Sequence, residues 1–455
     1  MRKGWSAKSA LAIGTAVLVS VGIFSSPAKA AAEPMTITIW TFGDVIQRDL
    51  VQQYKVLHPE ITLEIKKSDL DPLNGTALVT SCADYLRTKR LGTPPDVVAI
   101  EVSYSGYWRS YPQCFQDLRQ MHTSDANVAG GIVAGKSATD MKKDYLGWRW
   151  EHGVGYNDSV IGIPTDVGGL EVAYRVDLFA KAGLPTDRVA VGKLWPTWDA
   201  FIATGQKYMK KLSATQKKSG MGFIDNVGTI YAAILNQGTA KYYQNNGTDA
   251  GKLIYTTNPQ IKNAWDTTIK ATTAGIGTRI GQYTADWNTG MNKGTFATIL
   301  APAWMMDYIK GQAPDTKGKW DIANLPVSGG NQGGTQLAVP AWSDKKQAAF
   351  DFISWYLAPA QELYVFKKYG LFPAASSLYD DAALLNYKDA FFNNAPVGKI
   401  YTEGVTKLKP IFEGKLQRAI DQAFGAGLGR VAAKKMTSAK SWEQVMKDLQ
   451  KVVNP

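Results

Sequence analysis

The stretch VIGIPTDVGGLEVAYRVDLFAKAGLP, residues 160–185, decides how this chain is organised. It contains an apolar strand (VIGIP), a loop with two adjacent glycines (TDVGG), a second strand (LEVAYRV) and a helix that ends at Gly183. Glycine adopts backbone angles that other residues avoid, so a strand can leave one lobe through such a loop and enter another. The pattern predicts a hinge crossing between two lobes.

A second stretch, GGNQGGTQLAVPAWS at residues 329–343, repeats the arrangement, because glycines again precede a strand. Before the first crossing, strand-like segments at 35–40, 61–67 and 96–102 alternate with helical ones. Alternating strands and helices are typical of a parallel sheet covered by helices. After the second crossing the pattern is mostly helical. The sequence therefore predicts an α/β protein.

The length of the chain also favours two lobes. At 455 residues it exceeds what one hydrophobic core usually serves. The crossings divide it into an N-terminal lobe of residues 31–167 plus 335–376 and a C-terminal lobe of residues 168–334 plus 377–455. We expect the ligand cleft to lie between them.

The first thirty residues are expected to be a secretory signal peptide. Three basic residues in the first eight positions precede an apolar run at 10–24, and Ala28 and Ala30 have the spacing that signal peptidase recognises. The run is shorter than the roughly twenty residues that span a bilayer, although an uncleaved anchor is the alternative. No lipid-anchor cysteine is seen at the cleavage point. We expect an exported protein in the periplasm or the extracellular medium.

The charge does not indicate a nucleic-acid partner. The formal net charge is +12, but four of the basic residues lie in the expected signal peptide. The other lysines are scattered and are not interleaved with aromatic residues along a strand. They are best interpreted as a solvated surface.

The two cysteines, Cys82 and Cys114, are expected to form a disulfide, because an exported protein meets an oxidising compartment. The three histidines lie in no motif with them, which argues against a catalytic thiol. No metal-binding spacing appears, so neither a metal site nor a cofactor is expected.

Four segments together resemble one known family: ITIWTFGD (37–44), GIPTDVGGLEVAYRVDLFAKAGLP (162–185), GTFATILAPAW (294–304) and VFKKYGLFPAASS (365–377). They are similar to the carbohydrate-binding extracellular solute-binding proteins, the maltodextrin-binding-protein group with the periplasmic-binding-protein type II fold. The resemblance implies two hinged lobes that close over a sugar and deliver it to the permease of an ABC transporter. It also implies a monomer.

Positions that match the family are the candidate ligand-binding residues. Asp166 and Glu101 are expected to accept hydrogen bonds from sugar hydroxyls, and Trp304 to stack on a sugar ring. The glycines would let backbone amides approach the ligand. Each residue could instead be an ordinary core or turn residue. The complete set is Trp40, Phe42, Asp44, Glu101, Tyr104, Asp166, Trp287, Trp304, Gly333, Gly334 and Phe372.

Two other functions remain open. The same fold could bind a polyamine, a metal ion or an anion, or the chain could be an exported glycan-active enzyme. Neither HExxH nor GxSxG occurs, and we expect no catalytic residues. The sequence does not identify the sugar or its length, and it assigns no role to the cluster around Trp148 and Trp150.

Overall fold

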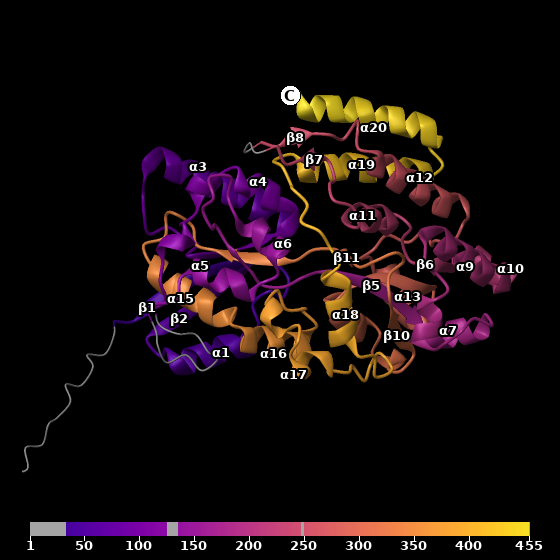
Figure 1. Cartoon of the computed structure of the whole chain (residues 1–455), viewed down its shortest axis with the longest axis horizontal. Coiled ribbons are helices and arrows are strands. Elements are labelled where there is room, and N and C mark those ends of the chain that lie inside the picture. Colours follow the sequence, from indigo (N-terminus) through magenta and orange to yellow (C-terminus); the bar gives the residue numbers. More distant parts are fainter. Residues whose placement is uncertain (1–32, 125–134, 247–249, 455) are drawn as a thin grey trace, which may run out of the picture.

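The computed structural model describes residues 33–124, 135–246 and 250–454. The expected signal peptide, residues 1–30, lies outside the described residues. Two separate β-sheets form the centres of two groups of elements, which lie at the left and the right of Figure 1. The two-lobed α/β fold that the sequence predicts is confirmed.

The first sheet collects strands from both ends of the chain. Strand β1 is parallel to β2 and β3, whereas β12 is antiparallel to β3 and β4. Thr335 pairs with Glu101, so the second crossing returns beside the end of β3. The order is β2 (Ile61–Lys67), β1 (Met35–Thr41), β3 (Val97–Glu101), β12 (Thr335–Ala338) and β4 (Ile163–Pro164).

The second sheet is built around β5 (Gly169–Arg175), in which every residue is buried. Strands β9 and β10 are antiparallel to β5, and β6 is parallel to β9. The order is β10 (Trp320–Ala323), β5, β9 (Phe296–Pro302) and β6 (Gly222–Ile224), with β11 (Gly330–Asn331) paired to the start of β5.

The two glycine-rich crossings connect the sheets and lie against each other. The amide of Gln332 donates a hydrogen bond to the carbonyl of Gly168 over 2.8 Å. A Cβ on Gly168 would overlap the carbonyl oxygen of Gln332, and Gly333 and Gly334 have φ angles of +79° and +117°. Side chains are strained at such angles, so the crossings need glycine at these positions.

Helices cover both sheets. The N-terminal sheet is packed by α1 (Arg48–Leu57), α3 (Leu78–Thr88), α15 (Lys346–Tyr356) and α16 (Pro359–Tyr369). Around the second sheet lie α7 (Val176–Lys181), α9 (Trp198–Lys211), α11 (Thr229–Asn236), α12 (Pro259–Thr273), α13 (Ala285–Lys293), α14 (Met305–Gln312), α18 (Val397–Val405), α19 (Gln417–Ala432) and α20 (Ser438–Val453). In the described part of the chain, no helix combines the length and the apolar character that crossing a membrane requires.

The predicted elements differ from the observed ones mainly at their ends. Thr197 caps α9 by accepting a hydrogen bond from the amide of Ala200 at 3.2 Å. The first helix begins at Arg48, because the preceding residues form turns. Of the strand predicted at 160–164, only the last two residues, Ile163–Pro164, form a strand in the structure.

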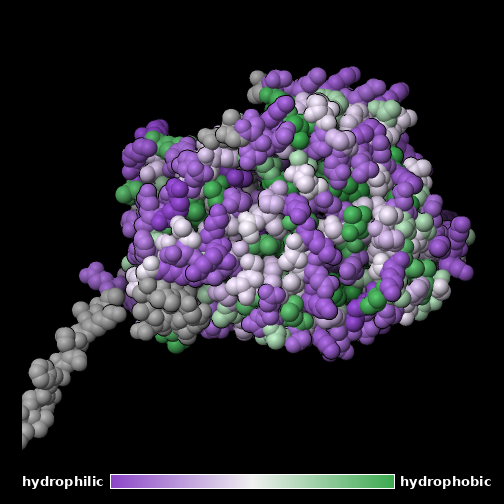
Figure 2. Space-filling model, in the orientation of Figure 1, coloured by the Kyte–Doolittle hydropathy of each residue, from purple (hydrophilic) through white to green (hydrophobic). Residues whose placement is uncertain are grey.

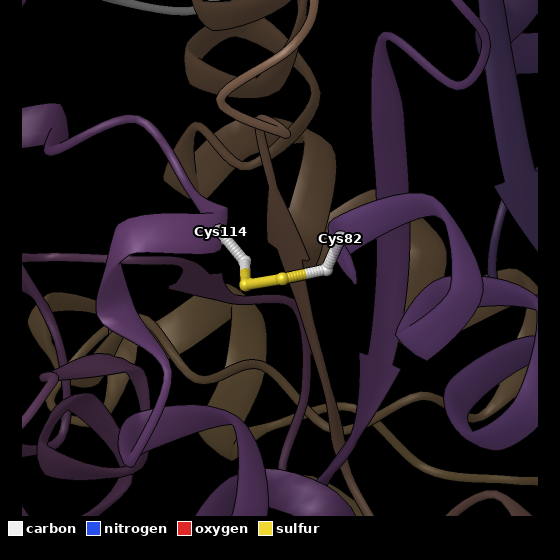
Figure 3. Close-up of a disulfide and its surroundings, with 2 residues drawn as sticks. All are labelled: Cys82 and Cys114. Carbon is white, nitrogen blue, oxygen red and sulfur yellow. A yellow bond between two sulfur atoms is a disulfide. The ribbon is translucent and has the colours of Figure 1, made fainter. Parts of the chain in front are cut away.

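The structure contains the predicted disulfide between Cys82 and Cys114 (Figure 3). Cys82 lies in α3, Cys114 ends a short 3₁₀ helix, and their Cα atoms are 5.4 Å apart. Both side chains are buried. The bond therefore fastens α3 to the loop that follows the end of β3.

Candidate ligand-binding site

A cavity of about 220 Å³, called the neck below, lies where the end of β3 meets the second crossing and residues of the C-terminal helices. Residues from the surroundings of both sheets line it, and many of them are polar. The complete lining is Glu101, Val102, Ser103, Trp148, His152, Ala232, Asn236, Lys241, Asn331, Gln332, Gly333, Leu408, Lys409, Ile411, Glu413, Gln417 and Asp421.

A larger cavity of about 510 Å³, called the groove below, adjoins the neck. It lies among α11, α12 and α19 at the upper right of Figure 1. Its lining is Asn226, Val227, Gly228, Thr229, Tyr231, Ala232, Leu235, Asn236, Lys241, Thr268, Thr272, Gln332, Asp421, Gly425, Leu428, Gly429 and Ala432.

A third connection, residues 406–416, forms one wall of the neck. It runs from α18 up to α19 in Figure 1. The hydroxyl of Tyr156 donates to the carbonyl of Glu413 over 3.0 Å, and the Tyr156 and Phe412 rings stack with centroids 5.7 Å apart. A Cβ on Gly106 would overlap the carbonyl of Gly414. The third connection is therefore packed closely against the loop that follows β3.

Three buried acceptor atoms on residues that line the neck are left unpaired. Across residues 33–124, 135–246 and 250–454, no donor reaches Asn331 Oδ1, Glu413 Oε2 or Gln417 Oε1. A buried acceptor without a partner costs about 1–3 kcal/mol. Hydrogen-bond donors of a ligand are the kind of partner that such acceptors lack. The neck is therefore suited to a molecule rich in O–H or N–H groups.

The charges in the neck are partly paired. Lys241 Nζ lies 3.1 Å from Glu413 Oε1, and Asp421 accepts a hydrogen bond from the Tyr242 hydroxyl at 2.7 Å. Burial lowers the Lys241 pKa, but attraction to Glu413 and Asp421 outweighs it and raises the pKa overall. Burial raises the pKa of the Glu101 and Asp421 carboxyls. The neck thus holds more acidic groups than basic ones.

Arg149 fastens the two crossings together behind the neck. Its fully buried guanidinium donates to the carbonyls of Asp166 and Thr335 over 2.9 and 2.5 Å, and it lies 3.4 Å from His152 Nδ1. Beside it, the Trp148 indole donates to the carbonyl of Val405 over 3.3 Å. The cluster that the sequence left without a role therefore binds both crossings and the end of α18, where the third connection begins.

Two predicted residues, Glu101 and Gly333, line the neck. Trp304 lies next to them, because its indole donates to the carbonyl of Gln332 over 3.0 Å. Its half-buried ring faces the second crossing. These three residues come from the first sheet, the second crossing and the end of β9, and the fold brings them together.

The remaining residues of the first lobe lie outside both cavities. Trp40 is inside β1 rather than in the loop that follows it, and it packs on a core cluster. Phe42 is half-buried, and Asp44 is exposed and paired with Lys67. The Tyr104 hydroxyl donates to Asp71, and its ring lies beneath the Arg418 guanidinium with its centroid 4.4 Å away.

Four predicted positions are engaged in contacts within the protein in this structure, and their role as ligand contacts stays a prediction. Trp287 and Phe372 have no exposed surface, and the Trp287 indole donates to Asp225 over 3.0 Å. Buried Asp166 accepts the amide of Thr335 at 2.8 Å. Gly334 leaves room for Arg149, since a Cβ there would lie 3.0 Å from Nε.

Several lining residues were not predicted from the sequence. Asn331 and Gln332 lie within the predicted second crossing, directly before the candidate glycines, so its polar side chains could have been included as candidates. Lys241 belongs to no motif that the sequence offered. The residues from the third connection and α19 had no recognisable pattern, because that connection lacks a glycine-rich loop. The loop at 226–229 follows a strand, β6, that was not predicted.

Residues 83–392 match the bacterial extracellular solute-binding protein family. An arabinooligosaccharide-binding protein from Bacillus subtilis (strain 168) is 29% identical over 213 residues, which cover 44% of this chain and 45% of the relative. The chain thus spans about half the length of the curated relatives that it matches.

Solved structures are similar over nearly the whole chain. An extracellular solute-binding protein of family 1 is 29% identical, with a TM-score of 0.77, and the match covers 92% of this chain and 100% of that one. An ABC-transporter-associated binding protein from B. animalis subsp. lactis Bl-04, solved with β-1,6-galactobiose, is 20% identical with a TM-score of 0.70, covering 92% and 97%. The second likeness shows the fold alone. Since the family match covers more than half of the residues, this chain belongs to the bacterial extracellular solute-binding protein family.

Proposed function

We propose that the protein captures an oligosaccharide in the neck and delivers it to the permease of an ABC transporter without breaking a bond. The observation that carries the proposal is the set of unpaired acceptors, Asn331 Oδ1, Glu413 Oε2 and Gln417 Oε1. Sugar hydroxyls are donors that can pair with them. The half-buried Trp304 ring beside Gly333 supports the proposal, because an indole can stack on a sugar face.

The connections between the lobes support a closing motion. Hinge closure around a ligand is an established type of transition. We propose that residues 31–167 and 335–376 move against residues 168–334 and 377–455, with the crossings as hinges. The exported protein would act as a monomer and present the closed form to the permease. Because two relatives are arabinooligosaccharide-binding proteins, an arabino-oligosaccharide is the first ligand to test.

The test is a titration monitored by tryptophan fluorescence. We would add arabino-, galacto- and malto-oligosaccharides, and, as separate arms, spermidine and ferric ion. We expect one sugar series to bind and the other arms to give no saturable change. Spermidine binding alone would replace the sugar proposal, because Glu101, Glu413 and Asp421 could also hold a polycation.

A matched pair of variants on α19 ties binding to the neck. Gln417→Met removes an acceptor that lines the neck, whereas Gln422→Met changes an exposed residue on the same helix. We expect Gln417→Met to weaken sugar binding on the order of tenfold, which corresponds to about 1.4 kcal/mol, and Gln422→Met to leave it unchanged. Equal affinities for both variants would place the sugar elsewhere.

A further inference from the structure

The neck and the groove are adjacent cavities. They share five lining residues, Ala232, Asn236, Lys241, Gln332 and Asp421. Ligand sites usually measure about 300–1,000 Å³. The neck, at about 220 Å³, is smaller than that range, whereas the neck joined to the groove of about 510 Å³ lies within it. A ligand that fills the neck therefore has space to continue into the groove.

The α19 wall of the groove lacks side chains at two positions one turn apart. Gly425 and Gly429 both line it, and both are exposed. A Cβ added to either would meet no atom of the described residues within 4 Å. Glycine inside a helix is about 1 kcal/mol less favourable than alanine. Neither crowding nor helix propensity accounts for these glycines, but keeping the groove open does.

The groove lining is mostly neutral. Amides and hydroxyls come from Asn226, Thr229, Thr268 and Thr272, and the charged lining residues Lys241 and Asp421 sit at the junction with the neck. At the neck end, Glu413 and Gln417 are less than a tenth exposed and keep unpaired acceptors within the described residues. A ligand made of uncharged, hydroxyl-bearing rings suits a neutral groove that leads into a polar neck with unpaired acceptors.

We propose that the groove is an extended subsite for the further rings of an oligosaccharide, and that Gly425 and Gly429 determine how many rings are bound. The proposal rests on the proposed function and adds ligand length to it. Rings beyond those in the neck lie along the bare face of α19 between α11 and α12. A large side chain at either glycine blocks them without touching the neck.

The test compares affinities along sugar series of increasing length. Calorimetry is performed with arabino-, galacto- and malto-oligosaccharides of two to six rings on the wild type, Gly425→Leu, Gly429→Leu and Ala426→Leu. Ala426 is exposed on the same helix and does not line the groove, so it is the matched control. Leucine favours helix more than glycine does, and melting curves confirm that each variant is folded.

The expected result has two parts. The wild type and Ala426→Leu bind longer sugars more tightly than disaccharides, and the two glycine variants lose on the order of tenfold affinity for the longer sugars only. If the wild type binds sugars with no dependence on length, or the glycine variants keep the full gain, the extended subsite is wrong and the proposed function stands. If no series binds the wild type, both are wrong.

Discussion

The neck and the groove are adjacent but differ in how they are built. The neck is enclosed by buried charges, three chain connections and close backbone contacts, with Arg149 and Lys241 surrounded by carboxylates. The groove is open, mostly neutral and lined by helix faces that include Gly425 and Gly429. From this difference we expect the neck to hold one part of the proposed ligand in a preorganised position and the groove to tolerate variation.

The largest expected effect is on the stability of the neck. Arg149→Met removes the buried guanidinium that joins both crossings and leaves the backbone carbonyls of Asp166 and Thr335 without these donors. A buried acceptor left without a partner costs about 1–3 kcal/mol, so we expect about 4 kcal/mol less free energy of unfolding in urea denaturation for the two together.

The control for Arg149→Met is Arg430→Met on α19, whose guanidinium lies 3.5 Å from Asp448 and is partly exposed. Such a pair contributes less than about 1 kcal/mol. If the two variants lose equal stability, the neck is not the more rigid region.

The second effect is a pH dependence from Asp225, just before the loop that lines the groove. Burial raises its pKa from 3.8 to about 6, although Gln282 and Trp287 donate hydrogen bonds to it. The folded protein therefore holds this proton more tightly than the unfolded chain does. The contribution to stability is complete below about pH 4 and is lost as the pH rises through 6, by about 3 kcal/mol.

Urea denaturation of the wild type and Asp225→Asn from pH 4 to pH 7 measures this contribution. We expect the difference between their free energies of unfolding to change by about 3 kcal/mol over that range. Parallel curves would show that Asp225 ionises normally.

The third effect concerns the indole at the boundary of the neck. Trp304→Ala removes a ring that could stack on sugar, and we expect affinity to fall on the order of tenfold, or about 1.4 kcal/mol. Trp304→Phe keeps a ring and should retain most of the affinity. Calorimetry with the best sugar from the panel measures both. Similar losses in the two variants would indicate that the hydrogen bond to Gln332, rather than stacking, matters.

The smallest effect tests the tolerance of the groove. Gly429→Ala adds one methyl group where no described atom lies within 4 Å. Replacing glycine by alanine in a helix should raise the free energy of unfolding by about 1 kcal/mol and leave disaccharide binding unchanged. Thermal melting and calorimetry check the two parts. A loss of stability would mean that the position is packed.

The sequence predicted the parts of the fold that have strong local patterns. The glycine crossings and the strand-like segments at 35–40 and 96–102, observed as Met35–Thr41 and Val97–Glu101, have local physical causes. The binding site has no comparable local pattern. On the face shown in Figure 2, hydrophobic residues are scattered among hydrophilic ones and do not mark a binding surface. Architecture could therefore be predicted to a greater extent than the site.

The candidate site depends on contacts between residues far apart in the chain. Lys241 forms an ion pair with Glu413, which lies 172 positions away in the sequence, and no local pattern predicts that pairing. The family resemblance makes Trp287 a candidate ligand contact, but its buried indole donates a hydrogen bond to Asp225 within the core. Buried polar groups need partners, and which residues provide them is known only once the chain is folded.

The most direct test of the account is a crystal structure with the tightest-binding oligosaccharide of the panel. We predict an intact sugar in the neck, with hydroxyls that donate to Asn331, Glu413 and Gln417 and further rings along α19. A sugar bound at another surface, or one found cleaved, would contradict the account.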